Sequence, residues 1–407
     1  MPRILLLLIP LLLNVETAPA KTLYVSKSGD GSHGLSWETG FNQISRALIE
    51  SVTNDVIRLS AEVYRENLIV ATPVTIIGGY VPGVLIDEGS PSDYSTIESA
   101  NESRFVFQIS HDSILKRLRV TKGRGGIKVS DCRAMISECV VENNGSFGSI
   151  ETGILSISAD LTMENCEISR NEAAGFGAGV RAVDSRVQVI GSTFFKNIGH
   201  DIPGHPGIGI PHHLGKGAGL HLEESQAVLA NCLLFENEAP EGADIYLRNA
   251  SIHCVNCTFA STKYPPLFKD ESTTTTGPTG FINCIVWGHA TSFQGEGWTV
   301  CHSNVRGGHL GEGNLDSDPV FLDATNYNYE LERGSPCIDS GTDTEITTDL
   351  DGNPRPVDVL GIGLDGPGAY DMGCYEFQLK KSDLTRDGKV DAEDLLMFQE
   401  EWMREGE

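Results

Sequence analysis

The sequence is poor in positive charge and, beyond its first residues, in long apolar runs. It holds 30 lysine and arginine residues against 56 aspartate and glutamate residues, which gives a formal net charge of -26. Proteins that bind nucleic acid neutralise phosphates with basic groups, so we expect no nucleic-acid partner. No later stretch is apolar enough to span a bilayer, and we expect no transmembrane segment. An acidic chain of this kind suits calcium binding or plain solubility.

The one long apolar run lies at the N-terminus. Arg3 precedes it, Leu5–Leu13 form it, and Ala18–Ala20 place small residues where a signal peptidase would cleave. The run is shorter than the ~18–20 residues that cross a membrane. The pattern predicts a signal peptide over residues 1–20, and hence a secreted or cell-surface protein whose mature chain begins near Lys21.

A repeat runs through the middle of the chain. Three columns recur along it: Cys139, Cys166, Ser192, Cys232, Cys257 and Cys284; Asn144, Asn171, Asn197 and Asn237; and Gly126, Gly153, Gly179, Gly219 and then Asp244. The first column has intervals of 27, 26, 40, 25 and 27 residues. Short alternating apolar runs separated by turn residues lie between the columns, which is typical of short strands rather than helices. The pattern predicts stacked coils, with the cysteines in the core and the asparagines hydrogen-bonded at a turn where they tolerate left-handed backbone.

The repeat resembles the pectin-lyase-like parallel β-helix repeats of many secreted bacterial proteins. The resemblance covers about residues 100–325, and TLYVSKSGDG, SWETGFNQISRAL and PVTIIGGY resemble the first strand, capping helix and first coil of that family. It implies an all-β, right-handed parallel β-helix over residues 21–325, with an N-terminal helical cap over the open apolar end. It also implies an extracellular polysaccharide as partner. Binding, cleavage by a lyase or glycosidase, and a structural or adhesive role remain open, and we expect a monomer.

The segment 326–377 has a different pattern. Its SPCIDSG and DMGCYEF motifs resemble the C-terminal segment of secreted β-helix proteins of the choice-of-anchor type, which usually read SPAIDAG and DIGAYE. Cys337 and Cys374 stand where that family has alanines. Because the two departures occur together, the resemblance leads us to predict a Cys337–Cys374 disulfide, the alternative being two independent buried thiols.

The final segment, 378–407, contains the motif DLTRDGKVDAED followed by an amphipathic run. Its oxygen donors have the spacing of a calcium loop: Asp383, Thr385, Asp387, Lys389 through its carbonyl, Asp391 and Asp394. The motif resembles one dockerin type I repeat, which implies Ca²⁺ as a cofactor and a cohesin-like or cell-surface partner. Dockerins that bind cohesins carry two such repeats, whereas this chain has one. A solvated acidic linker with a short helix is the alternative.

One face of the predicted coils carries a candidate site. Counting from the glycine column, Lys128, Arg181, His221 and Tyr246 point outward, and Glu223 lies beside them. Cationic and aromatic groups on a flat face suit an acidic polysaccharide, although an ordinary solvated face fits as well. Should the chain cleave such a polymer by β-elimination, Lys128 or Arg181 would be the base. A hydrolase needs two carboxylates, and only Glu223 and its neighbour Glu224 are candidates here.

The insertion 198–216 is the second candidate site. It lengthens one coil and contains His205, His212 and His213, together with His200 and Asp201. Histidine with aspartate can bind a metal ion or transfer protons near neutral pH. The spacing matches no known metal motif, and a glycine- and proline-rich surface loop with incidental histidines is the alternative.

Overall fold

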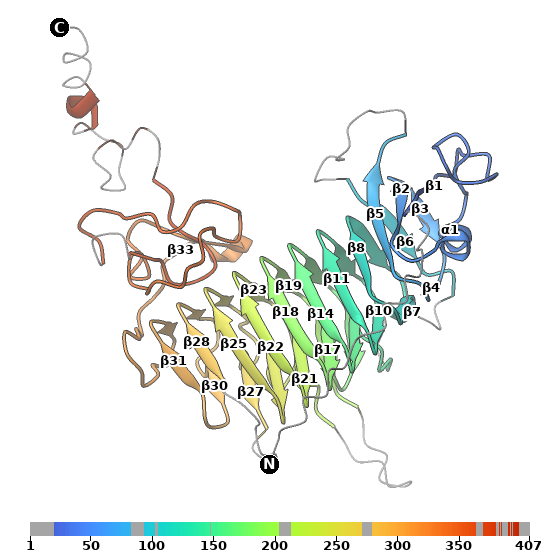
Figure 1. Ribbon diagram of the computed structural model, residues 1–407. Helices are drawn as coiled ribbons and strands as arrows, with labels where there is room; N and C mark the ends of the chain where they lie inside the picture. Colours follow the sequence, from blue (N-terminus) through green and yellow to red (C-terminus); the bar gives the residue numbers. More distant parts are fainter. Residues whose placement is uncertain are drawn as a thin grey trace, which may run out of the picture.

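The computed structural model describes residues 20–82, 93–101, 105–146, 148–202, 213–270, 279–363 and 369–379, together with 382, 384, 390, 392 and 394–398. Over these ranges the chain forms a stack of parallel strands in three sheets, so the predicted β-helix is confirmed (Figure 1). No helix in these ranges is long and apolar enough to cross a membrane.

We name the three sheets A, B and C. Each full coil of the chain passes first through sheet C, then through sheet A and then through sheet B. Sheet C consists of β4 (Leu68–Val70), β7 (Phe105–Ile109), β10 (Gly125–Ser130), β13 (Ile154–Ile157), β17 (Val180–Val183), β21 (Leu220–Glu223), β24 (Ile245–Arg248), β27 (Leu267–Lys269) and β30 (Phe293–Gln294). Sheet A consists of β1 (Thr22–Val25), β2 (Asp55–Ser60), β5 (Val74–Tyr80), β8 (Ser113–Lys116), β11 (Arg133–Ser137), β14 (Asp160–Glu164), β18 (Arg186–Ile190), β22 (Gln226–Ala230), β25 (Ser251–Val255), β28 (Gly280–Ile282) and β31 (Thr299–Cys301). Sheet B consists of β3 (Val63–Arg65), β6 (Ser95–Glu98), β9 (Leu118–Thr121), β12 (Val140–Glu142), β15 (Glu167–Ser169), β19 (Thr193–Phe195), β23 (Leu233–Phe235), β26 (Thr258–Phe259), β29 (Ile285–Val286) and β32 (Asn304–Val305).

The corners between sheets depend on single residues in the left-handed region. In one coil these are Asp131, Glu138 and Asn143, with φ of 54°, 50° and 52°. The asparagine column follows the third corner instead of occupying it, so the expectation that Asn144 itself takes left-handed backbone is wrong. Its side chain turns inward and is fully buried, where Asn171 Oδ1 accepts hydrogen bonds from both the backbone N and Nδ2 of Asn144 at 3.1 Å. The buried asparagine side chains therefore connect neighbouring coils by hydrogen bonds inside the stack.

The cysteine column faces the core, as predicted. Cys139, Cys166, Cys232, Cys257 and Cys284 are free thiols with at most 3% of their surface exposed. Burial raises the pKa of Cys139 and Cys232 well above that of an ordinary thiol, so both stay protonated and unreactive. Cys254 is buried as well, although strand alternation alone would place it opposite Cys257, because the corner at Asn256 turns the chain between them.

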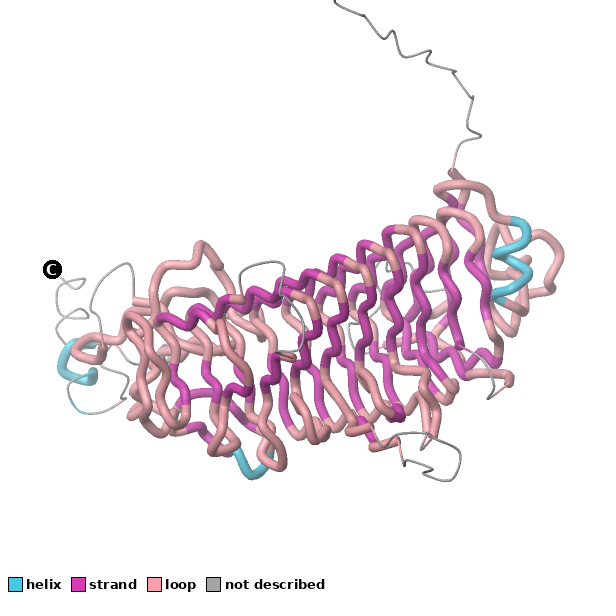
Figure 2. The backbone as a smooth tube through the Cα atoms, turned by 90° about the horizontal axis from the view of Figure 1, so that it is seen from below, coloured by secondary structure: helices cyan, strands magenta, loops and turns pink. Residues whose placement is uncertain are grey.

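The N-terminal end of the stack carries the helix α1 (Ile44–Glu50), which Figure 2 shows at one extremity of the solenoid. Ile44 and Ala47 on this helix are fully buried in the main core cluster. The helix therefore covers apolar groups that the first coil would otherwise expose, as a terminal cap must.

The C-terminal segment packs against the side of the β-helix. It contains the antiparallel pair β33 (Phe321–Asp323) and β34 (Asn328–Leu331), joined by the 3₁₀ turn η2 (Ala324–Asn326). Asn231 and Asn283, at the corners between sheets A and B, donate side-chain hydrogen bonds to the carbonyls of Thr348 and Thr342 at 2.7 and 2.6 Å. The segment is thus bound to the solenoid by corner residues as well as by apolar packing.

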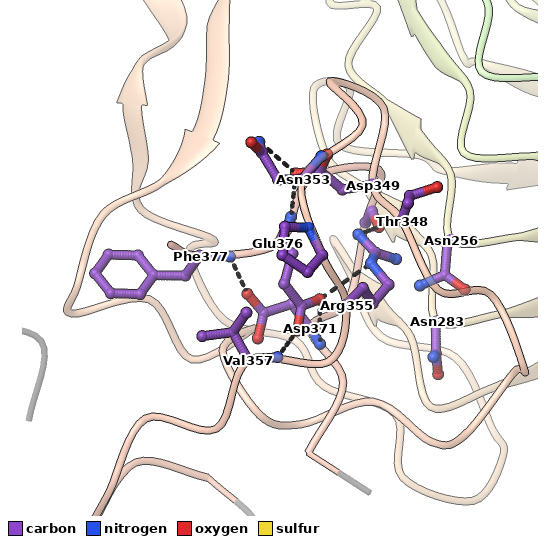
Figure 3. A network of polar contacts seen from close by, with 12 residues as sticks. Asn256, Asn283, Thr348, Asp349, Asn353, Arg355, Val357, Asp371, Glu376 and Phe377 are labelled. Atoms are coloured by element: carbon purple, nitrogen blue, oxygen red, sulfur yellow. Dashed lines mark hydrogen bonds and ion pairs between the residues drawn. The ribbon is translucent and has the colours of Figure 1, made fainter. Parts of the chain in front are cut away.

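A buried polar network holds this segment together (Figure 3). Arg355 forms an ion pair with Glu376 at 3.0 Å, and both side chains are fully buried. Asp371 accepts backbone hydrogen bonds from Asp339 and Phe377 at 2.8 and 2.6 Å. Crowding of these carboxyl groups in a buried site raises the pKa of Asp371, mainly through burial and then through Glu376.

Candidate functional site

The structure places the predicted column of sheet C in register. Lys128, Leu155, Arg181, His221 and Tyr246 pair in succession across β10, β13, β17, β21 and β24. Lys128 and Arg181 are half-buried, but His221 and Tyr246 are each only 1% exposed. The expectation that these two rings are presented to solvent is therefore wrong.

Ring stacking explains why His221 and Tyr246 are covered. Their ring centroids lie 4.9 Å apart, and Tyr246 stacks in turn on Phe268 at 5.2 Å. Phe176, from the loop before β17, closes the other side of His221 at 5.3 Å. Because the strands of a parallel sheet lie about 4.8 Å apart, rings in one column cover each other's faces.

The charges on this face are paired. Glu223 lies 3.4 Å from Arg181 and 3.0 Å from Arg248. Arg181 is thus engaged in an ion pair, and a guanidinium stays protonated in proteins, which argues against its predicted role as a base. Burial, followed by the positive charges of Arg181 and Lys216, lowers the pKa of His221 to about 3, so that its ring remains neutral.

The insertion is described only at its two ends. His205 and His212 lie outside the described residues, while His213 is exposed and its backbone pairs with Ile202. His200 lies 3.1 Å from Glu172. Among the described residues no group of three or more His, Cys, Asp and Glu could hold a metal ion.

The predicted Cys337–Cys374 disulfide is not formed in the structure. Both residues are free thiols, and they belong to different core clusters. The sulfur of Cys337 accepts a hydrogen bond from Asn304 Nδ2 at 3.1 Å, whereas Cys374 packs in the cluster of Phe235 and Tyr329. The prediction failed because two small side chains can replace alanines in separate packing sites without meeting.

The predicted calcium loop lies almost entirely outside the described residues. Asp383, Thr385, Asp387, Lys389 and Asp391 are not described. Asp394 is described; it is buried and lies in the helical stretch 394–398. Calcium binding therefore remains a prediction.

A groove on sheet A was missed by the sequence reasoning. It consists of three adjoining hollows of ≈ 660, ≈ 360 and ≈ 400 Å³. Asp112 and Arg133 line both the first and the second, Arg186 and Gln226 line both the first and the third, and Asp160 lines all three. Because they share these residues, the hollows adjoin one another in a shallow channel across β5, β8, β11, β14, β18 and β22, which lie side by side in Figure 1.

Two outward columns of sheet A line the groove. The first hollow lies over the column of Arg133, Asp160, Arg186 and Gln226. The second and third hollows lie over the neighbouring column, the floor column, whose members pair in succession across the sheet: Thr75, Ile114, Met135, Thr162, Gln188 and Val228. The repeat could have revealed this column, because the same alternation that turned the cysteines inward fixes which residues of RAMIS, DLTME, RVQVI and QAVLA turn outward.

The rim of the channel carries most of its charge. Asp131, Asp184 and Glu224 occupy the left-handed corners between sheets C and A and are exposed. Arg133 lies 3.0 Å from Asp112, and Arg186 lies 3.8 Å from Asp160. The backbone N–H of Arg133 and its nearby charge lower the pKa of Asp112, so this carboxyl is ionised at neutral pH.

Comparisons with known proteins agree with this architecture. The model of the right-handed β-helix region matches residues 82–295, and no curated protein matches the chain. A solved pectate lyase, Pel9A, is 13% identical with a TM-score of 0.51, over 89% of this chain and 97% of that chain. A pectin methylesterase from Aspergillus niger is 14% identical with a TM-score of 0.40, over 74% of this chain and 88% of that chain. An alginate lyase from Paenibacillus sp. str. FPU-7 is 11% identical with a TM-score of 0.40, over 69% and 99%.

At 13% identity and a TM-score of 0.51, Pel9A shows a shared fold alone. The family model, in contrast, covers more than half of the sequence and coincides with the coils seen in the structure. The protein belongs to the right-handed parallel β-helix family.

Proposed function

We propose that this protein is secreted and binds a linear extracellular polysaccharide along the sheet A groove. The observation that carries the proposal is the continuity of the channel along the stack from β5 to β22. Five strand spacings give it a length of about 24 Å, which spans several sugar units of an extended chain. A rigid, elongated and shallow channel suits an extended polymer better than a compact small molecule, which is bound mostly in enclosed pockets.

The side chains of the floor support a sugar ligand. Ile114 and Val228 are 38% and 45% exposed and offer apolar surface to the faces of sugar rings. Thr162, Gln188 and Gln226 add hydroxyl and amide groups that can exchange hydrogen bonds with sugar hydroxyls. Alternating apolar and hydrogen-bonding groups are what recognition of a polyhydroxylated chain requires.

A binding assay with groove variants tests the proposal. Gln188→Ala combined with Gln226→Ala removes two exposed amides from the channel, and we expect binding of a polysaccharide to weaken about tenfold, since each hydrogen bond contributes ~0.5–1.5 kcal/mol. Gln43→Ala is the matched control, because Gln43 is exposed, lies at the N-terminus of α1 and makes no side-chain capping bond. Equal affinities of the wild type and the double variant, measured by calorimetry, would contradict the proposal.

Cleavage of the bound polymer is a second candidate function. It draws support from the first hollow, which gathers the carboxylates of Asp131, Asp160, Asp184 and Glu224 along the path of the proposed ligand. Glycoside hydrolysis uses two carboxylates on either side of the scissile bond, and β-elimination leaves an unsaturated product. Incubation with a polysaccharide panel distinguishes these activities by new reducing ends and by ultraviolet absorbance.

The two terminal segments complete the proposal. The N-terminal signal peptide would export the chain, and the dockerin-like loop would bind Ca²⁺ and attach the protein to a cohesin-like or cell-surface partner. The apolar side chains of Leu395, Leu396, Met397 and Phe398 are 41–59% exposed on the short helix that follows the loop, and they support an attachment role for the tail.

A further inference from the structure

The floor column of the sheet A groove is uncharged, while the neighbouring outward column carries Arg133, Asp160 and Arg186. Along its length the floor column offers only hydroxyl, amide, thioether and aliphatic groups, from Thr75 to Val228. A polysaccharide in the channel would therefore place its ring faces and hydroxyls against neutral groups. Nothing on this floor would neutralise a row of carboxylates along a uronate chain.

The rim of the groove adds a net negative charge. Arg133 and Arg186 are the basic residues among those that line the three hollows, and each has an aspartate partner, Asp112 or Asp160. This pairing leaves the charges of Asp131, Asp184 and Glu224 in excess. These three exposed carboxylates occupy three of four successive corners along one edge of the channel, and Ser158 occupies the fourth.

The face of sheet C supplies little compensating charge. Glu223 pairs with both Arg181 and Arg248, and Lys216 lies 2.9 Å from Glu241. Cations that already have carboxylate partners attract a polyanion weakly, because their fields largely cancel beyond a Debye length of about 8 Å. Glu223 offsets one of its two arginine partners and Lys128 adds another positive charge, so the face of sheet C keeps a small positive charge, but it lies on a different sheet from the groove.

From these charges we infer that the groove selects an uncharged polysaccharide and rejects uronate polymers. Ionised carboxylates accept short, strong hydrogen bonds from sugar hydroxyls, so the rim can bind a neutral glycan directly. The same carboxylates repel the carboxylates of a uronate chain, and repulsion of a wrong ligand is an effective source of specificity. This inference rests on the proposed binding function and adds to it the class of the ligand.

A matched pair of ligands tests the selection. Oligomers of galacturonic acid and the same oligomers after full methyl esterification differ in charge on one backbone, and neutral glucan, mannan and xylan oligosaccharides extend the panel. We expect calorimetry at low salt, in the presence of a chelator, to detect binding of neutral oligosaccharides at least tenfold tighter than that of any uronate oligomer. Raising the salt concentration should narrow this ratio, because screening weakens the repulsion.

A rim variant provides the second arm of the experiment. Asp131→Asn, Asp184→Asn and Glu224→Gln together remove the excess charge, and asparagine tolerates the left-handed corners at 131 and 184. We expect the ratio of neutral to uronate affinity to fall at least tenfold in this triple variant. The control triple Glu296→Gln, Glu312→Gln and Glu330→Gln makes the same change in net charge at exposed positions away from the groove and should leave the ratio unchanged.

The outcomes separate the two claims. The selection would be overturned if uronate oligomers bound more tightly than neutral ones. It would also be overturned if uronate binding appeared on addition of Ca²⁺ and exceeded that of the neutral ligands. Both results would leave the binding function in place. An equal response of the two triple variants would assign the effect to overall charge and overturn the role of the rim. Binding of no oligosaccharide of either class would overturn the proposed function and this inference with it.

Discussion

Asn197 shows how one residue type holds the stack together. Its Nδ2 donates to Asn237 Oδ1 at 3.0 Å and to the carbonyl of Ile168 at 2.8 Å, and its Oδ1 accepts from Asn171. These groups are fully buried, so removing one partner leaves others without hydrogen bonds. We expect Asn197→Ala to lower the free energy of unfolding in urea by about 2–3 kcal/mol. Gln188→Ala, at an exposed position of sheet A, should change it little; a similar loss in both variants would contradict this role of the ladder.

Glu376 gives the fold a dependence on pH. Burial raises the pKa of Glu376 to about 7, well above that of an ordinary glutamate, despite the nearby Arg355. A raised pKa means that the folded state favours the protonated form, so the associated stability is complete at low pH and is lost as pH rises through about 7. Asp244 shifts in the same direction, also to about 7 by burial. We expect the melting temperature to fall between pH 5.5 and 8.5, and Glu376→Gln to reduce that slope; an unchanged slope in the variant would refute the assignment.

Arg355 is the cation of the same network. Removing it leaves Glu376 without its buried partner, and such changes typically cost ~3–5 kcal/mol. Arg355→Met should therefore destabilise the C-terminal segment by an amount in this range, while the double variant with Glu376→Gln should recover part of the loss. Chemical denaturation of the two variants tests this; equal losses would show that the pair is not coupled.

Residue-level predictions from the sequence succeeded where alternation alone decides the outcome. The cysteines turned inward and Lys128, Arg181, His221 and Tyr246 turned outward, as the repeat requires. Exposure could not be predicted in the same way, because the cover over His221 comes from Phe176 in the loop before β17 and from ring stacking between coils. The Cys337–Cys374 disulfide was predicted wrongly for a similar reason. The two cysteines lie in a segment without a repeat, so the sequence does not show how far apart their side chains are.

At the scale of elements, the C-terminal segment acts as a lateral cover for sheet B. Tyr329 packs against Phe235 and Phe321, with ring centroids 5.3 and 5.2 Å apart, and is 4% exposed. We expect Tyr329→Ala to weaken this docking by about 3–5 kcal/mol, as is usual for loss of a buried aromatic ring. Hydrogen exchange should accelerate in residues 337–376 of the variant while the strands of sheets A and C stay protected. Uniform acceleration throughout the chain would contradict a local role.

The dockerin-like loop yields a separate prediction at this scale. Calorimetric titration of the mature chain should detect one Ca²⁺ site, and a chain ending at residue 379 should lack it. Loss of the ligand carboxylate in Asp387→Ala should abolish the heat in the full chain, since a hard cation depends on these oxygen donors. Retained binding in the shortened chain would place the site elsewhere.

The order of the elements was predictable from the repeat, but their lateral packing was not. The intervals of the cysteine column predicted one coil for each period, and the resemblance of SWETGFNQISRAL to the lead-in of the β-helix family predicted the cap now seen as α1. Docking of the C-terminal segment depends on Asn231 and Asn283, which are corner residues that look like any other turn asparagine in the sequence. Such contacts join residues more than fifty positions apart and leave no periodic signal.

At the scale of the whole molecule, the groove arises from stacking. Each strand of sheet A contributes one outward residue to the floor column, which runs from Thr75 to Val228. The left-handed corners at Asp131, Asp184 and Glu224 form the rim beside it. The β-helix thus converts a short repeat into a surface as long as an extended polymer. The net charge of -26 is distributed so that this surface lacks unpaired cations among its lining residues.

A crystal structure of the mature protein soaked with a neutral oligosaccharide would show where the ligand binds. We expect electron density for sugar rings along sheet A, over Met135, Thr162 and Gln188 and beside the rim carboxylates. Ordered sugar on the face of sheet C beside Arg181 and Glu223, with the sheet A groove empty, would contradict binding in this groove.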